Sequence, residues 1–238
     1  MKTLGIVGGL GPESTIDYYR SIISGFREKT GNSGYPRIII VSLDVDKALG
    51  MLNADELPQL AEYQLGAVRQ LAAAGAGFAL VSANSGHIVF EAMRRSSPLP
   101  LISIVEATCE EVKRRGLTTV GLLGTRFTMS GRFYPDVFDK HGIRLVTPSP
   151  EEQAYIHDKY VNELLLGKFL PETRERLTQI IAIMKQRDAI EGIVLAGTEL
   201  PLILRAESIA GMPMFDTTQI HVRAAVAEMF SGESQPND

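Results

Sequence analysis

Short apolar runs alternate along this chain with longer segments in which apolar residues recur at helical spacing. The runs are apolar on successive residues rather than on alternate ones, which is typical of parallel strands that helices cover on both faces. Glycine or polar residues bound most of them. The predicted strands are residues 4–9, 37–43, 78–83, 99–104, 119–124, 143–148 and 192–197.

The segments between these runs predict amphipathic helices. In residues 13–28, Ile16, Tyr19 and Ile23 fall on one helical face, and Ser14 is the expected N-cap. The other predicted helices are 55–74, 86–96, 105–115, 129–140, 151–167, 172–188 and 217–230. Alternation of strands and helices favours a doubly wound α/β fold, with parallel sheets flanked by helices.

An internal repeat predicts two similar halves. Residues 5–8 resemble residues 121–124 at an offset of 116 (121 − 5), and residues 81–85 resemble 195–199 at an offset of 114 (197 − 83). In each pair an apolar strand opens into a loop that carries glycine, serine or threonine. We therefore expect two pseudo-symmetric α/β domains.

The expected domains have a boundary near residue 100. Residues 1–100 and about 211–238 form the first domain, and residues 101–210 form the second. Ligands of open α/β sheets bind outside the carboxyl ends of the strands. The loops at 8–14, 83–87, 124–129 and 197–201 are therefore expected to meet in a ligand cleft between the domains. The tail after residue 230 is expected to be loose.

Composition and charge exclude several classes of protein. The 238 residues are 45% hydrophobic and carry a net charge of −4, as in ordinary globular proteins. Lysine and arginine form no basic run, so a nucleic-acid partner is not expected. No apolar run reaches the length of about 18 residues needed to cross a membrane. The start lacks the features of a signal peptide, and the single cysteine excludes an internal disulfide, so a cytoplasmic location is expected.

Histidine and cysteine give little support to metal chemistry. The four histidines, His87, His141, His157 and His221, have no metal-binding spacing, and no cysteine–histidine cluster exists. His87 lies in an expected site loop, where it is either an acid or base or a residue that holds the loop. His221 is interpreted as structural. Cys109 lies on an apolar helical stripe and is expected to be a buried, inert thiol.

Two glycine-bearing loops are candidate carboxylate sites. Residues 8–12 follow a strand and precede a helix, so their amides either bind an anion or form a structural turn. Thr125 and Thr128 in the loop 123–129 supply hydroxyl groups, or they only cap the next helix. Lys47 follows the second strand and either meets an anionic ligand or is solvated.

Five motifs resemble the aspartate/glutamate racemase family, in its branch of aspartate racemases and broad-specificity amino-acid racemases. They are GIVGGLGPESTIDYY, SANSGH, LLGTRFTM, LAGTELPL and MFDTTQIH, in order along the chain. The resemblance implies two pseudo-symmetric α/β domains with the active site between them and no cofactor. It implies a small amino acid or dicarboxylate as the ligand. Relatives of this kind are often dimers, so it also suggests a homodimer.

The resemblance implies catalysis by two thiols, one on each side of the substrate α-carbon. One thiolate removes the proton, and the other thiol returns one from the opposite face. The family's loops read C-N-T-x-H or T-N-T-x-H in the first half and G-C-T-E in the second. Here the two positions fall on Ala83 and Gly197, which carry no ionisable group. The matching residues implied to contact the ligand are Leu10, Asn84, Ser85, Thr198 and Glu199, beside the candidates Lys47, Thr125 and Thr128.

The vacant positions predict racemisation that is weak or absent, because a proton-transfer residue typically contributes about 10²–10⁴-fold. Four interpretations stay open. His87, Glu199 or Ser85 has taken over proton transfer, or the protein is a lyase or isomerase of the same superfamily. It is otherwise a binding protein without turnover, or a laboratory variant of an active enzyme.

Overall fold

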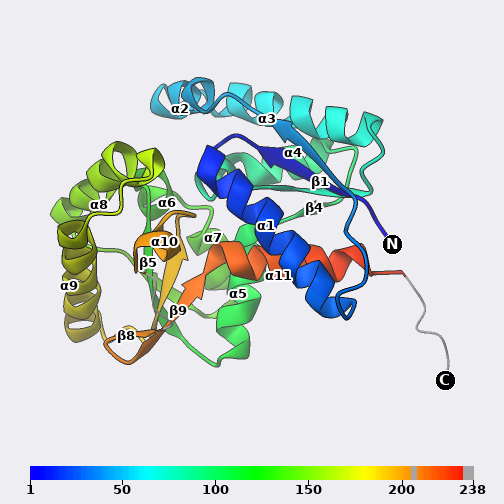
Figure 1. Cartoon of the computed structure of the whole chain (residues 1–238). Helices are drawn as coiled ribbons and strands as arrows, with labels where there is room; N and C mark the ends of the chain where they lie inside the picture. The colour runs from blue at the N-terminus through cyan, green and yellow to red at the C-terminus, as the bar shows by residue number, and fades with distance from the viewer. Residues whose placement is uncertain (205–207, 233–238) are drawn as a thin grey trace. The chain divides into compact units, whose positions relative to one another are not determined.

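The computed structural model of the protein describes residues 1–204 and 208–232 and contains two compact units. The first unit holds residues 1–82, 89–103 and those from 221 on, and the second holds 83–88 and 104–220. Figure 1 follows the chain through its elements. Residues 233–238, which include most of the tail expected to be loose, lie outside the described residues. The domain boundaries at residues 100 and 211 stay predictions.

A parallel four-stranded sheet forms the centre of the first unit. Its strand order is β2-β1-β3-β4, and each neighbouring pair is parallel. The strands are β1 (Leu4–Gly8), β2 (Ile38–Ser42), β3 (Phe78–Val81) and β4 (Leu101–Ile102). The helices of this unit are α1 (Pro12–Lys29), α2 (Val45–Asn53), α3 (Leu57–Ala73), α4 (Phe90–Ser96) and the larger part of α11 (Thr217–Met229).

Helices cover both faces of this sheet. Leu4 and Ile6 of β1 face α1 and α11, where Tyr18 and Val226 belong to the same buried cluster. On the opposite face α3 approaches β1 so closely that a side chain at Gly5 would meet the side chain of Leu71. Figure 1 shows α1 and α11 on one side of β1 and α2 and α3 on the other.

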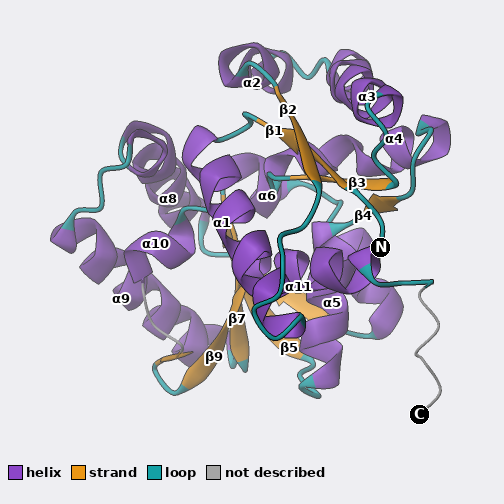
Figure 2. Ribbon diagram, turned by 45° about the vertical axis from the view of Figure 1, so that its right-hand side comes forward, coloured by secondary structure: helices purple, strands orange, loops and turns teal. Residues whose placement is uncertain are grey.

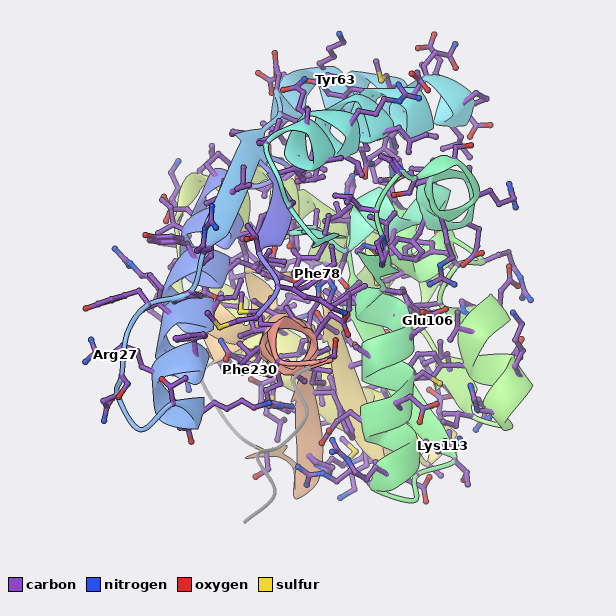
Figure 3. The ribbon with its side chains drawn as sticks, turned by 90° about the vertical axis from the view of Figure 1, so that its right-hand side faces the viewer. Arg27, Tyr63, Phe78, Glu106, Lys113 and Phe230 are labelled. Carbon is purple, nitrogen blue, oxygen red and sulfur yellow. The ribbon has the colours of Figure 1, made fainter. Side chains whose placement is uncertain are left out.

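The core of the first unit reaches the end of α11. Figure 3 labels Phe78, which is fully buried in β3, and Phe230, which follows α11. The ring of Phe230 stacks on that of Phe26, with centroids 5.4 Å apart. The strand β2 is less covered than the sequence predicts, since Ile40 is 40% exposed at this edge of the sheet.

A mixed five-stranded sheet forms the centre of the second unit. Its order is β6-β5-β7-β9-β8, with only β8 antiparallel to its neighbour. The strands are β5 (Thr119–Gly124), β6 (Arg144–Val146), β7 (Gly192–Ala196), β8 (Ser208–Ile209) and β9 (Met212–Asp216). The α-helices are α5 (Ile104–Arg114), α6 (Arg126–Ser130), α7 (Pro135–Phe138), α8 (Pro150–Asn162), α9 (Pro171–Asp188) and α10 (Leu200–Leu204). The 3₁₀ turns are η1 (Ser85–Val89), η2 (Asp139–His141) and η3 (Leu164–Leu166).

Two apolar clusters lie on opposite faces of this second sheet. Leu123 and Leu195 pack with residues of α8, α9 and α10. Val120 and Val194 pack instead with residues of α5 and α7. Figure 2 shows β5, β7 and β9 between α9 and α5. The central strands β5 and β7 therefore bury both faces, which explains why their sequences are continuously apolar.

The two sheets share one strand order, because β2-β1-β3-β4 in the first unit corresponds to β6-β5-β7-β9 in the second. The repeat at residues 5–8 and 121–124 falls on the equivalent strands β1 and β5, and the other repeat begins on β3 and β7. The predicted α/β fold with two pseudo-symmetric halves is confirmed. No helix among the described residues is long and apolar enough to span a membrane.

The start of α1 differs from the prediction that Ser14 is its N-cap. Gly11 takes that position and Pro12 begins the helix. Proline suits the first turn because its fixed φ is already helical and its missing N–H has no partner to lose. Ser14 lies inside the first turn, where its hydroxyl group donates a hydrogen bond of 2.9 Å to the carbonyl oxygen of Ser82.

The predicted helix over residues 129–140 is wrong. The chain instead forms α6 from Arg126, an extended break at Gly131, and then α7 from Pro135. A side chain at Gly131 would meet the carbonyl oxygen of Phe127 at 2.5 Å. Only glycine fits this tight end of α6, so the apolar periodicity continues through two short helices rather than one.

The sequence patterns also miss α2, α10 and the strands β8 and β9. Asp44 caps α2, since its carboxylate accepts from the amides of Asp46 and Lys47. The nine residues of this helix are too few to show a clear helical period in the sequence. Strand β9 contains Pro213, which usually argues against a strand in the middle of a sheet. It nevertheless pairs with β7 through Met214, Phe215 and Asp216.

Candidate functional site

Polar residues of the second unit gather at the carboxyl ends of its parallel strands. Thr125 follows β5, Thr198 follows β7 and Thr217 follows β9. Because parallel strands end at the same edge, these residues lie close together. The segment 83–88, which belongs to this unit, contacts the same edge. We call the group the polar cluster: Asn84, Ser85, Thr125, Thr128, Tyr134, Tyr160, Thr198, Glu199 and Thr217.

The side chain of Asn84 is fixed between two other members of the polar cluster. Its amide nitrogen donates to the hydroxyl group of Thr217 at 3.1 Å, and its oxygen accepts from the hydroxyl group of Tyr134 at 2.7 Å. Thr217 in turn donates to the carbonyl oxygen of Leu195 at 2.8 Å. An asparagine amide carries two donors, so one of them can still be directed to a ligand.

Three hydroxyl groups form a second part of the polar cluster. Ser85 Oγ lies 2.9 Å from Thr125 Oγ1, which lies 3.4 Å from Thr128 Oγ1. Thr125 is the N-cap of α6, but its side chain makes no capping hydrogen bond. The hydroxyl group of Thr125 therefore serves this hydroxyl chain instead of the helix. Hydroxyl groups can both donate and accept, which suits a ligand with carboxylate and ammonium groups.

His87 holds its own loop through the backbone. Its Nδ1 lies 2.8 Å from the carbonyl oxygen of Ala83, and its Nε2 accepts from the amide of Ile104 at 3.1 Å. A nitrogen that accepts from an N–H carries no proton, so the neutral tautomer has its hydrogen on Nδ1. The ring is 1% exposed. Acid–base chemistry at His87 would therefore have to break one of these two bonds.

Glu199 and Tyr160 form a buried contact between a carboxylate and a phenol. The hydroxyl group of Tyr160 donates to Glu199 Oε2, and Thr198 donates to the same oxygen at 2.8 Å. All three residues are buried. Burial raises the pKa of Tyr160 well above its ordinary value, and the charge of Glu199 raises it further. Tyr160 therefore keeps its proton and acts as a donor.

The two positions that the family resemblance assigns to thiols are both buried and carry no ionisable group. Ala83 is 7% exposed, and its methyl group cannot transfer a proton. A Cβ atom at Gly197 would lie 2.5 Å from Tyr160 Cε2 and 2.9 Å from its hydroxyl oxygen. The phenol of Tyr160 thus occupies the space beside Gly197.

The cysteine of this chain lies away from these positions. Cys109 is fully buried in α5 among the apolar residues that include Val105 and Val112. Burial raises the pKa of its thiol to about 11. A protonated, inaccessible thiol is a poor nucleophile, as the sequence predicts.

Thr218 adds a buried polar atom next to the cluster. Its side-chain oxygen has no hydrogen-bond partner among the described residues, and the residue is 1% exposed. Leaving a buried hydroxyl group unsatisfied costs about 1–3 kcal/mol. Thr218 is the neighbour of Thr217, which contacts Asn84. The hydroxyl group of Thr218 is therefore a candidate donor or acceptor for a ligand.

Leu10 and Lys47 belong to the first unit and the polar cluster belongs to the second, so a shared role in one site stays a prediction. Lys47 is exposed in α2, with its ammonium group 4.6 Å from the centre of the Tyr63 ring. In the glycine loop, the amide of Gly9 donates to the hydroxyl group of Thr15 at 2.9 Å. This contact supports the interpretation of the loop as a structural turn.

His221 of the first unit is structural, as the sequence predicts. Its Nδ1 lies 2.9 Å from the hydroxyl group of Tyr18, and its Nε2 lies 3.0 Å from the carbonyl oxygen of Ile102. It is fully buried. Within residues 1–204 and 208–232, no group of three or more histidine, cysteine, aspartate or glutamate side chains is arranged to hold a metal ion.

Sequence reasoning missed Tyr134 and Tyr160. Both read as apolar positions of helical segments, and a buried tyrosine on such a stripe normally belongs to the core. The one available signal for Tyr160 was Gly197 itself, because a glycine after a buried strand often marks a close approach of another group. Thr217 begins α11, where no pattern in the sequence marks it as a site residue. Asp216 caps this helix, accepting from the amide of Gln219 at 3.0 Å.

Comparison with known proteins places this chain in a family. The family model of the Asp/Glu/hydantoin racemases matches residues 7–225. A crystal structure from Yersinia pestis, provisionally assigned as an Asp/Glu racemase, is 32% identical with a TM-score of 0.88, over 97% of this chain and 100% of that chain. An aspartate racemase homologue from Pyrococcus horikoshii OT3 is also 32% identical, with a TM-score of 0.83 and coverage of 96% and 99%.

A curated relative gives the same result. The broad specificity amino-acid racemase RacX of Bacillus subtilis (strain 168) is 27% identical over 166 residues, which are 68% of this chain and 69% of RacX. The family model spans most of the sequence and both units of the fold. The protein therefore belongs to the Asp/Glu/hydantoin racemase family.

Proposed function

We propose that this protein binds a small amino acid or dicarboxylate at the polar cluster and racemises it slowly or not at all. The interpretation rests on one observation. The two family thiol positions, Ala83 and Gly197, are vacant inside an otherwise polar, buried site. Stereochemical inversion needs a proton acceptor on one face of the α-carbon and a donor on the other. Neither a methyl group nor a backbone hydrogen supplies them.

The three candidate substitutes are engaged in other contacts. His87 holds the backbone with both ring nitrogens, and Ser85 shares its hydroxyl group with Thr125. Glu199 receives hydrogen bonds from Tyr160 and Thr198. Both donors contact the same carboxylate oxygen, so a proton transferred to that oxygen would have to displace one of these hydrogen bonds. These contacts favour slow or absent proton transfer.

The neutral polar groups support ligand binding. Asn84, Ser85, Thr198 and the buried hydroxyl group of Thr218 offer donors and acceptors within a small region. The relatives support amino acids as the ligand class, because their names refer to aspartate, glutamate and a broad range of amino acids. The position of the site between two domains and the homodimer stay predictions, as does the cytoplasmic location expected from the single cysteine and the start of the chain.

The experiment has three measurements on the same protein. Calorimetry with each enantiomer of aspartate and glutamate measures binding. Incubation of the same ligands in D₂O, followed by ¹H NMR, measures exchange at the α-carbon, and chiral chromatography measures inversion. We expect binding with exchange far slower than in a two-thiol racemase.

Each alternative result would assign a different activity to the protein. Rapid exchange with inversion would contradict the proposal and require another pair of acid–base groups. Exchange without inversion would indicate a single base. Release of CO₂ would indicate a lyase, which protonates a carbanion without first removing a proton. No binding of either enantiomer of aspartate or glutamate would exclude these two amino acids as the ligand.

A further inference from the structure

The space beside Gly197 is filled by one side chain. An added Cβ atom would meet Tyr160 at three atoms: Cε2 at 2.5 Å, the hydroxyl oxygen at 2.9 Å and Cζ at 3.1 Å. Distances below 3.0 Å are not tolerated between a Cβ atom and another heavy atom, so one of the two groups would have to move. The backbone at Gly197 is not in the left-handed region, since its φ lies outside that range. Volume, and not φ, therefore requires the glycine.

Tyr160 is not a flexible neighbour that can swing aside. It is 4% exposed and packs in the cluster that contains Ile156, Leu164 and Leu195. Its hydroxyl group is anchored to Glu199. The ring thus has apolar packing along its body and a charged partner at its tip, which is the arrangement that fixes a buried tyrosine.

We infer that Tyr160 takes the volume of a side chain at position 197 and, as a positioning residue, holds the Glu199 carboxylate at the carboxyl end of β7. At the carboxyl end of β7, a phenol–carboxylate pair then takes the place of the thiol that the family resemblance implies. The role of Tyr160 in ligand binding rests on the function proposed above, whereas the inference about the volume beside Gly197 does not.

This arrangement has a chemical consequence for the site. Because its pKa is raised by burial and by Glu199, Tyr160 can donate a hydrogen bond but is not available as a base. A thiol at position 197 could not simply be added, since it would displace the ring and break the contact with Glu199.

A thermal double-mutant cycle tests the volume. Gly197→Ala should lower Tm by about 3–10 °C, because overpacking a core costs 1–3 kcal/mol. In a Tyr160→Leu background, which lacks the ring atoms that meet the Cβ atom, the same change should cost little. In a Tyr160→Phe background, which keeps Cε2 and Cζ, the loss should persist. Gly66→Ala is the matched control, because nothing lies within 4 Å of a Cβ atom there.

Two results of this cycle would overturn the inference. In the first, Gly197→Ala lowers Tm no more than Gly66→Ala does in the wild-type background. Alternatively, it would lower Tm equally with leucine and with tyrosine at position 160, which would show that the ring does not fill the space.

The positioning role is tested by ligand binding. Tyr160→Phe keeps the ring and removes only the hydroxyl group, so it should weaken aspartate binding about tenfold while the protein stays folded. Tyr155→Phe, on the same helix, is the control and should bind like the wild type. Equal binding by both variants would exclude the role in holding Glu199. If the wild type itself binds no aspartate, the proposed function fails, and the thermal cycle still decides the inference about volume.

Discussion

His87 shows how a residue that looks catalytic in the sequence can be a support of the backbone. An imidazole in a loop after a buried strand is a reasonable acid or base. Here its two nitrogens join the carbonyl oxygen of Ala83 to the amide of Ile104. The contact with Ile104 links residues 17 positions apart, and the contact with Ala83 fixes the start of the segment that carries Asn84.

We predict that His87→Ala destabilises the protein by about 2–4 kcal/mol. It removes two buried hydrogen bonds and leaves a cavity. Chemical denaturation measures the change, and His141→Ala, at a half-exposed position, is the control. A loss of α-proton exchange with unchanged stability would instead assign His87 to catalysis.

The candidate site could be predicted only in part at this scale. Asn84, Ser85, Thr125 and Thr198 carry polar atoms at strand ends, and that pattern is visible in the sequence. Tyr160 is brought to the site by a helix 37 residues earlier in the chain than Gly197 (197 − 160), and no local pattern records such a distance.

The helix α8 is the element that positions Tyr160. A capping box begins it: Ser149 Oγ accepts from the amide of Glu152 at 3.3 Å, and Glu152 Oε2 accepts from the amide of Ser149 at 2.9 Å. Pro150 occupies the first helical position. These residues satisfy amides that a helix start leaves without partners.

Ser149→Ala should therefore lower the free energy of unfolding by about 1 kcal/mol, and Ser149→Thr should retain most of it. Urea denaturation measures both. An alanine variant as stable as the wild type would show that the cap contributes nothing.

Element boundaries were predictable where local chemistry decides them and not elsewhere. The long amphipathic segments predict α3, α8 and α9 nearly correctly, because each of these helices packs one apolar face against the sheet of its own unit. The division of residues 126–138 into two helices depends on the crowding around Gly131. The strand β9 depends on pairing with β7, a contact between residues far apart in the sequence.

On the scale of the whole molecule, two buried tyrosines and one buried cysteine make stability fall at alkaline pH. Burial raises the pKa of Tyr134 and Tyr160 above their usual values, and that of Cys109 to about 11. In the folded protein these groups keep protons that the unfolded chain loses at lower pH. Unfolding therefore releases protons in alkaline solution, and stability falls as pH rises.

We predict that stability from these groups is fully present below pH about 8 and falls above pH about 9–10, by up to 1.4 kcal/mol per pH unit for each group. Urea denaturation at pH 8, 9.5 and 10.5 measures the slope. Tyr134→Phe should make it shallower, and a flat profile to pH 10.5 would contradict the prediction.

The two-fold organisation was the most predictable property of the whole chain. The repeat between residues 5–8 and 121–124 lies on equivalent central strands, whose glycines and apolar residues are set by packing. The assignment of individual segments to units is harder to predict, because it depends on which surfaces the loops contact.

The path of the backbone has a practical consequence for dissecting this protein. The chain passes from one unit to the other four times, after residues 82, 88, 103 and 220. The six residues 83–88 that bring Asn84 and Ser85 to the polar cluster are tethered on both sides to the other unit. No single proteolytic cut or truncation can release either half intact, so a fragment of residues 104–220 would lack Asn84. Engineering of the binding groups has to be carried out in the uncut polypeptide.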